Sequence, residues 1–255
     1  MKWLTLIVFI VVSFEAYSFV ILIDPGHGGE ELGAVATVKM KNSKGKTYHH
    51  KIFEKNLSLR LARKLKKNLD PYYTVYLTRS IDRKVSLQER ADMAETVKAD
   101  IFISIHFNAA HDKKSRGFET YFLGNHNDKA VKKMEDIENK DLKGEDKIIN
   151  QILIDLVIDK TVVSSKKLAN HVHSYLEKDI GKKFKMRNRE VKPSLFYVLA
   201  LSKRPGILIE GGFMTNDDEM KVINSDRYLD AYAKSMTKGI IKFFDSHPKK
   251  DLPLF

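Results

Sequence analysis

Three short segments of this chain place a histidine or a glutamate at the end of an apolar run typical of a β-strand. The segments are Asp24–Gly29, Ser104–His106 and Ile209–Gly211. In an open parallel sheet, functional groups collect beyond the carboxyl ends of the strands. Two histidines and one glutamate delivered to that edge are typical of a catalytic zinc site.

A hydrolytic zinc site needs three protein ligands and one open position for water, whose pKa the metal lowers to about 7. His27, Glu54 and His106 supply two imidazoles and one carboxylate, and the glycines around His27 allow a sharp turn beside the metal. Glu210 is the candidate general base and acid, because partial burial among apolar residues would raise its pKa. The alternative for Glu210 is a carboxylate that caps a helix.

The other histidines are weaker ligand candidates. They are His49, His50, His111, His126, His171 and His173. Adjacent histidines rarely bind one metal ion, and histidines two positions apart on a helix face different sides. We expect His111 and His126 to face solvent.

A further group of polar residues is expected to support the site. Asn108 would hydrogen-bond a substrate amide. Asp24 belongs to a turn and would orient His27 through a ring N–H. The residues expected to brace the surrounding loops are Arg79, Asp82 and Arg90.

Strand-like and helix-like segments alternate along the chain, which predicts a single-domain α/β fold with a mostly parallel β-sheet flanked by helices. The expected strands are 19–23, 73–78, 101–105, 117–123 and 206–210. The expected helices begin near 54, 86, 164, 216 and 226, and Ser86 with Glu89 forms a capping box. The polar stretch 30–53 is expected to be a loop or short hairpin over the site.

Residues 124–150 interrupt this alternation and are expected to form a helical insertion within the domain. Lys129–Lys140 is a strongly charged helical candidate, and Ile148–Ile158 is a dense apolar run.

Composition indicates a globular protein with a basic surface. The chain has 255 residues, of which 43% are apolar, no cysteine and a formal net charge of +12. The lack of cysteine excludes thiolate zinc ligands and cysteine nucleophiles. If residues 1–18 are a secretory signal, the protein is exported. A basic exported protein suits an anionic surface such as cell-wall polymer, and export argues against nucleic acid as a partner. The alternative is that the lysines form an ordinary solvated surface.

Residues 1–18 have the pattern of a secretory signal peptide. Lys2 precedes the apolar run Leu4–Val12, which is too short to span a bilayer, and small residues follow at Ala16 and Ser18. We expect cleavage after Ser18, one domain over 19–247, a short tail over 248–255 and no membrane span in the mature protein. An uncleaved anchor is the alternative.

Seven motifs along the chain are similar to those of one known protein family. They are Leu22–Gly29, Glu54–Leu57, Thr78–Asp82, Leu87–Ala94, Ser104–Ala109, Gly117–Phe122 and Ile209–Asn216. In this order they resemble the zinc-dependent N-acetylmuramoyl-L-alanine amidases over about 19–245. This family cleaves the amide bond between N-acetylmuramic acid and the L-alanine of the peptide stem in peptidoglycan.

The resemblance implies an exported, periplasmic amidase with one catalytic zinc ion, peptidoglycan as substrate and a role in cell separation. By position, His27, Glu54 and His106 match the zinc ligands of the family, and Glu210 matches its catalytic glutamate. The insertion resembles a helix that covers the zinc in division-associated members until an activator protein displaces it. By that resemblance Glu138, or alternatively Glu135, occupies the open zinc position at rest, and a solvated surface helix is the competing interpretation.

The chain departs from the family pattern in two places. The stretch between His27 and Glu54 is longer than usual, and Gly211 stands where threonine is common. Two other functions remain open at this point. A non-catalytic peptidoglycan-binding or regulatory protein would keep the same fold, and a zinc peptidase acting on stem peptides would share the metal chemistry.

Overall fold

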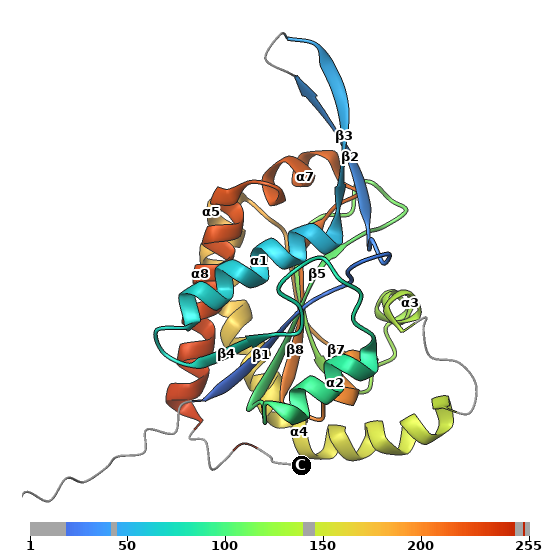
Figure 1. Ribbon diagram of the computed structural model, residues 1–255, viewed down its shortest axis with the longest axis vertical. Coiled ribbons are helices and arrows are strands. Elements are labelled where there is room, and N and C mark those ends of the chain that lie inside the picture. The colour runs from blue at the N-terminus through green and yellow to red at the C-terminus, as the bar shows by residue number, and fades with distance from the viewer. Residues whose placement is uncertain (1–18, 42–44, 140–145, 248–251, 253–255) are drawn as a thin grey trace, which may run out of the picture.

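The computed structural model describes residues 19–41, 45–139, 146–247 and 252 and shows an α/β domain built on one six-stranded sheet (Figure 1). The strands, in spatial order, are β4 (Thr74–Leu77), β1 (Val20–Pro25), β5 (Ile101–Asn108), β8 (Gly206–Phe213), β6 (Phe118–Leu123) and β7 (Asn188–Ser194). The first four are parallel, whereas β6 is antiparallel to β8 and parallel to β7. The predicted mostly parallel sheet is therefore confirmed.

Helices cover both faces of this sheet. The first face carries α1 (Glu54–Leu69), α8 (Asp226–Ser246) and the second half of α4 (Asp146–Leu176). The opposite face carries α2 (Leu87–Thr96) and α6 (Tyr197–Ser202). Sheets buried on both sides need apolar residues at nearly every strand position, which explains the unbroken apolar runs of β1, β5 and β8.

Strand alternation decides which face receives the polar residues of the motifs. In β1, Ile21 and Ile23 pack under α1, whereas Leu22 packs under α2 and α6. His106 and Glu210 occupy the alternate strand positions whose side chains point to the face covered by α2 and α6. They lie opposite one another in the register of β5 and β8. The candidate site therefore lies on that face, toward the carboxyl ends of the strands.

The stretch after β1 forms a two-stranded hairpin of β2 (Val35–Lys41) and β3 (Thr47–Phe53). Figure 1 shows that this hairpin projects away from the body of the domain. Only the segment before it, residues 30–34, lines the pocket of the candidate site. The hairpin itself was expected, but it does not cover the site.

The second half of the chain differs most from the sequence expectation. The apolar run Ile148–Ile158 and the helix expected at 164–178 are one helix, α4, which continues into a π-helical turn, η1 (Glu177–Gly181), and the short α5 (Lys182–Phe184). The insertion contains the helix α3 (Lys129–Glu138), as expected. Strand β7 and helix α6 were not expected, and α7 (Asp217–Ile223) completes the fold.

The predicted signal peptide, residues 1–18, lies outside the described residues, as does nearly all of the predicted tail. Within the described residues, none of the helices is both long and apolar enough to cross a membrane.

Candidate metal centre

Three elements bring the predicted metal ligands together. His27 follows β1 in a left-handed conformation with φ of 59°, Glu54 is the first residue of α1, and His106 lies in β5. The backbone at Gly26 passes so close to His106 that a Cβ there would lie 2.4 Å from the ring Nε2, so only glycine fits. The close approach sets the position of the His106 imidazole beside His27.

One carboxylate oxygen joins the two imidazoles. Glu54 Oε1 lies 3.1 Å from His27 Nε2 and 3.0 Å from His106 Nδ1. The same carboxylate accepts backbone hydrogen bonds from Ala34 at 2.7 Å and Phe107 at 3.0 Å, which hold it in place. The structure therefore brings all three predicted ligands into one cluster.

A fourth side chain, Glu138 from α3, reaches the same point. Its Oε2 lies 3.4 Å from His106 Nδ1 and 3.9 Å from His27 Nε2. His27, His106 and Glu138 each offer an atom within 4.8 Å of the other two. Glu54 lies closer still to both imidazoles, so the site offers two nitrogen and two carboxylate donors from well-separated parts of the sequence.

The charges of the cluster are mutually dependent. Burial lowers the pKa of His27, but the Glu54 carboxylate beside it outweighs burial and raises this pKa to about 9. Burial also raises the pKa of Glu54, yet the two histidines outweigh it and lower that pKa below its usual range. At neutral pH the protein thus holds an anionic carboxylate next to a proton on His27 that a metal cation would replace.

The donor set fits zinc. His27 Nε2 is buried and, although Glu54 Oε1 lies 3.1 Å away, it makes no hydrogen bond of good geometry within the described residues, which is costly unless a further group binds it. Two imidazoles and a carboxylate are a known ligand set of hydrolytic zinc, which keeps its fourth position for water. None of the other histidines among the described residues belongs to such a cluster.

Glu210 lies next to this cluster on β8. It is 1% exposed, it pairs with His106 across the β5–β8 register, and it lines the same pocket as His27 and Glu138. Its Oε2 has no hydrogen-bond partner within the described part of the chain. Burial, and then the neighbouring carboxylates, raise the pKa of Glu210 well above its usual value. The side chain therefore holds a proton more readily than an exposed glutamate, as a group that transfers protons in the site must.

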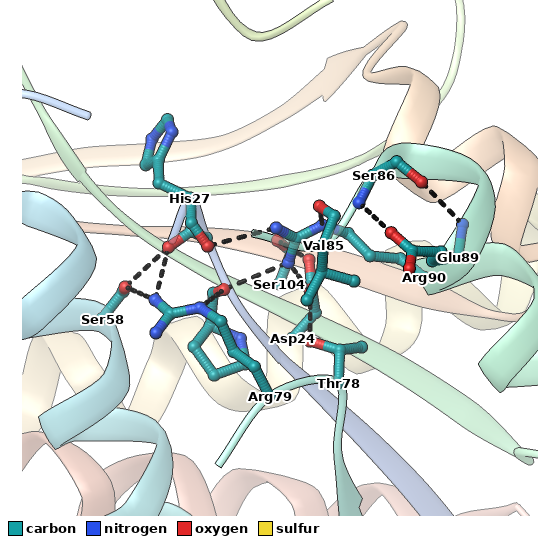
Figure 2. A network of polar contacts seen from close by, with 12 residues as sticks. Asp24, His27, Ser58, Thr78, Arg79, Val85, Ser86, Glu89, Arg90 and Ser104 are labelled. Carbon is teal, nitrogen blue, oxygen red and sulfur yellow. Dashed lines mark hydrogen bonds and ion pairs between the residues drawn. The ribbon is translucent and has the colours of Figure 1, made fainter. Parts of the chain in front are cut away.

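A network of buried polar groups, whose hydrogen bonds are satisfied, adjoins the candidate metal centre (Figure 2). Asp24 accepts hydrogen bonds from Thr78 at 2.7 Å and Ser104 at 2.9 Å and forms an ion pair with Arg90. Arg79 donates to the backbone oxygens of Pro25, Gly26 and Lys55. The predicted bracing role of Arg79 and Arg90 is confirmed.

The predicted role of Asp24 is wrong. Its carboxylate does not contact the His27 ring, because Thr78, Ser104 and Arg90 use both of its oxygens. Asp82 does brace a loop, since it accepts from Gly29 N at 2.8 Å and pairs with Lys55 Nζ at 2.7 Å.

Helix α3 is fastened to the turn between β7 and α6. Glu135 accepts from His126 Nε2 at 2.6 Å and from Leu195 N, and Asn139 bonds both Leu195 O and Tyr197 N at 2.9 Å. His126 therefore does not face solvent as expected, because its ring lies against Glu135. The structure places Glu138 at the metal centre and Glu135 in this attachment.

The remaining predicted residues lie elsewhere. His49 and His50 are exposed on β3, and His173 is buried between Thr120 and Asn188. Asn108 donates from Nδ2 to Glu119 Oε2 at 2.9 Å, whereas its buried Oδ1 has no partner among the described residues.

Sequence reasoning missed the polar group that surrounds Asn108. Glu119 on β6 pairs with Arg189 and Lys192 on β7. Their signal in the sequence was a charged residue inside the strand-like motif Gly117–Phe122, together with a basic run before an unrecognised strand.

Comparison with known proteins agrees with the fold and the cluster. A family model described as N-acetylmuramoyl-L-alanine amidase matches residues 21–242, so the chain belongs to that family. "N-acetylmuramoyl-L-alanine amidase AmiA" of Escherichia coli is 26% identical over 88% of this chain and 76% of its own length. The crystal structure of the N-acetylmuramoyl-L-alanine amidase from Clostridium difficile superposes with a TM-score of 0.65 at 28% identity, covering 90% of this chain and 98% of that one.

Other relatives are longer than this chain. "Probable N-acetylmuramoyl-L-alanine amidase AmiB" of Haemophilus influenzae is 29% identical over 95% of this chain, which spans 56% of that relative. The match therefore covers just over half of that protein.

Proposed function

We propose that this protein is an exported, zinc-dependent N-acetylmuramoyl-L-alanine amidase that acts on peptidoglycan. The observation that carries the proposal is the meeting of His27, Glu54 and His106 at one point, beside the buried Glu210, whose Oε2 has no hydrogen-bond partner in the described part of the chain. A metal centre next to a carboxyl group with a raised pKa is the arrangement that amide hydrolysis requires.

Each residue has a distinct task in this reaction. His27, Glu54 and His106 would hold zinc, which polarises a carbonyl and makes a bound water acidic. Glu210 takes the proton of the attacking water and passes it to the nitrogen of the leaving L-alanine. The burial that raises the pKa of Glu210 suits it to both transfers, because a group must hold and release a proton at the same working pH.

In this proposal α3 keeps the enzyme at low activity. The Glu138 carboxylate lies at the position from which substrate approaches the imidazoles, and α3 forms one wall of the pocket through Met134, Ile137 and Glu138. Glu135 and Asn139 hold the helix there. A protein activator that detaches α3 would open the metal centre, as regulated cell separation requires.

The proposal includes export to the periplasm, for which the signal-like residues 1–18 are the support. The net charge of +12 fits attraction to an anionic cell wall. A non-catalytic wall-binding protein and a zinc peptidase on stem peptides are the two competing functions that the experiment separates.

The experiment is digestion of purified peptidoglycan with zinc, followed by mass spectrometry of the released material. The wild-type protein, Glu210→Gln and the control His171→Asn are compared, because His171 lies outside the cluster. Stem peptides that begin with L-alanine, released by wild type and control but not by Glu210→Gln, support the amidase. Peptides cut within the stem would indicate the peptidase, and binding without release, even by protein carrying Glu138→Ala, would indicate the wall-binding protein.

A further inference from the structure

A second pocket adjoins the metal centre on the side of β7. It encloses about 430 Å³, and it shares Asn108, Met134 and Ile137 with the pocket that contains Glu138 and Glu210. The two pockets thus form neighbouring spaces along the same face of the sheet. Their floor is formed by Asn108, Glu119 and Arg189 of β5, β6 and β7, which stays in place when α3 detaches, so a substrate bound at the metal centre can extend from one space into the other.

The second pocket is positively charged. Three cationic side chains line it, Lys133 from α3 and Arg189 and Lys192 from β7, together with the imidazole of His111. Glu119 is the one acidic residue in its lining. Even with Glu119 ionised, the lining carries net positive charge and attracts an anion.

Glu119 binds two of these cations but does not use all of their hydrogen-bond donors. Its Oε1 accepts from Arg189 Nε at 2.7 Å and from Lys192 Nζ at 2.8 Å. Burial raises the pKa of Glu119, but the hydrogen bonds from Lys192 and Arg189 outweigh burial and keep that pKa below its usual value. Both amino groups at the far end of the Arg189 guanidinium remain without a hydrogen bond to any described residue, and they are available to a ligand.

The backbone is built to place Arg189 and Lys192 on one face. In a regular strand, residues three positions apart point to opposite sides. The pairing of β6 with β7 is irregular between Phe118 and Thr120, and Glu190 has a φ of 74°, so an extra residue brings Arg189 and Lys192 to the same carboxylate. The Phe213 ring lies 5.2 Å from the Arg189 guanidinium carbon and limits its orientation.

The distance across the sheet identifies the part of the substrate that reaches this pocket. His106, Glu210 and Glu119 lie in one transverse row of adjacent strands, and Arg189 pairs with Glu119 from the next strand. Two strand spacings, about 10 Å, separate Glu210 from β7, and the Arg189 guanidinium reaches back over part of this span because its Nε bonds Glu119 on β6. An extended peptide covers roughly 7 Å in two residues. The group at Arg189 is therefore one or two residues beyond the nitrogen that Glu210 protonates, and the second residue is the first that can carry a free carboxylate, because the first is alanine.

We propose that Arg189 and Lys192 form a specificity subsite for a free carboxylate on the second residue of the substrate peptide. The proposal rests on the amidase function proposed above, since that reaction sets the direction of the peptide. Guanidinium groups bind carboxylates through two parallel hydrogen bonds, so the subsite distinguishes a carboxylate from its uncharged amide. Asn108 lines both pockets, and its buried Oδ1, which has no partner among the described residues, is placed to accept a peptide N–H.

The experiment compares two N-acetylmuramoyl tripeptides that differ in one group. One carries L-alanyl-γ-D-glutamyl-L-lysine with a free α-carboxylate, and the other carries the same peptide with an α-carboxamide. Binding is measured by calorimetry to full-length protein carrying Glu138→Ala and Glu210→Gln, so that the Glu138 carboxylate does not block the site and the ligand is not hydrolysed. Further substitution with Arg189→Gln, Arg189→Lys or the control Lys234→Gln tests the subsite, because Lys234 is exposed on α8.

The proposal expects the carboxylate ligand to bind roughly tenfold to a hundredfold more tightly than the carboxamide. Arg189→Gln abolishes this preference by weakening only the carboxylate ligand, Arg189→Lys retains part of it, and Lys234→Gln leaves it unchanged. A general distortion of the pocket would weaken both ligands equally. Equal affinity of the starting protein for the two ligands, or no binding of either, overturns the subsite.

Hydrolysis by the protein with Glu210 intact separates this result from the proposed function. Cleavage of both tripeptides at the same kcat/KM would leave the amidase in place and remove the subsite. Carboxylate-selective binding without cleavage by the Glu138→Ala protein would retain the subsite and remove the amidase.

Discussion

Two buried polar regions meet at the turn that follows β1, and they differ in whether their polar atoms are satisfied. Behind the turn, Asp24 uses both carboxylate oxygens in contacts with Thr78, Ser104 and Arg90 (Figure 2). In front of it, a ring nitrogen of His27 and a carboxylate oxygen of Glu210 have no hydrogen-bond partner among the described residues. Because burying an unsatisfied polar atom is costly, the front region, around His27 and Glu210, is suited to binding a metal ion or substrate. The back region, around Asp24, is suited to holding the turn in place.

The largest expected effect follows from removing the proton carrier of the front region. Glu210→Gln should lower the rate of amide hydrolysis roughly 10²- to 10⁴-fold. It should change the free energy of unfolding by less than about 1 kcal/mol, because glutamine has the same shape and Oε2 makes no hydrogen bond. Rates of stem-peptide release and urea unfolding curves measure the two effects. A large loss of stability with unchanged activity would contradict the assignment of Glu210.

The back region should show the opposite pattern. Asp24→Asn leaves the buried Arg90 without its ion-pair partner and should lower the free energy of unfolding by about 3–5 kcal/mol. Urea unfolding of apo protein at pH 7 measures this loss separately from metal binding. A variant with wild-type stability would show that the saturated network does not support the fold.

The pH dependence of this network has a definite sign. Burial raises the pKa of Asp24, but Arg90 and the hydrogen bonds outweigh burial and lower it. The stabilisation is therefore complete above the unfolded-state pKa of about 3.9 and is lost as the pH falls through the lower folded-state pKa. The difference in stability between wild type and Asp24→Asn should accordingly shrink in strong acid and stay constant above about pH 5.

Proton release from the metal centre gives a third test. The Glu54 carboxylate overcomes burial and raises the pKa of His27 to about 9, so this imidazole is protonated throughout pH 6–8. Zinc must displace that proton, and its apparent affinity should rise about tenfold per pH unit over this range. Competition with a chelator at three pH values measures the slope. A zinc affinity independent of pH would show that His27 is not a ligand.

The smallest of these effects concerns α3. If Glu138 restrains the enzyme, Glu138→Ala should raise the rate of peptidoglycan hydrolysis without an activator by about tenfold. Asp136→Ala is the matched control, because Asp136 is an exposed acidic residue of the same helix. Equal rates for wild type and both variants would favour the solvated surface helix over a restraining one.

The sequence allowed the central strands and the meeting of His27, Glu54 and His106 to be predicted, because these residues stand at the ends of locally recognisable strands and helices. Apolar runs ending in Asp24, His106 or Glu210 predict strands whose ends meet at one edge of the sheet. The capping box at Ser86 and Glu89 was also confirmed, since its contacts span only three residues.

Long-range pairing accounts for the errors. Asp24 was assigned to His27, three residues away, but Arg90 reaches it across 66 positions. His126 was placed in solvent because the docking of α3 against Leu195 has no local signal. Strand β7 was missed because Pro193 and the irregularity at Glu190 interrupt the alternation that identifies a strand.

Calorimetric titration of metal-free protein with zinc shows whether the unsaturated region is a metal centre. We expect one zinc ion bound per chain in the wild type and in the control His171→Asn. We expect an affinity at least roughly a hundredfold weaker in His106→Asn, which loses a ligand while the network around Asp24 is retained. Equal zinc binding by His106→Asn, or no binding by the wild type, would contradict the assignment of the unsaturated region as the metal centre.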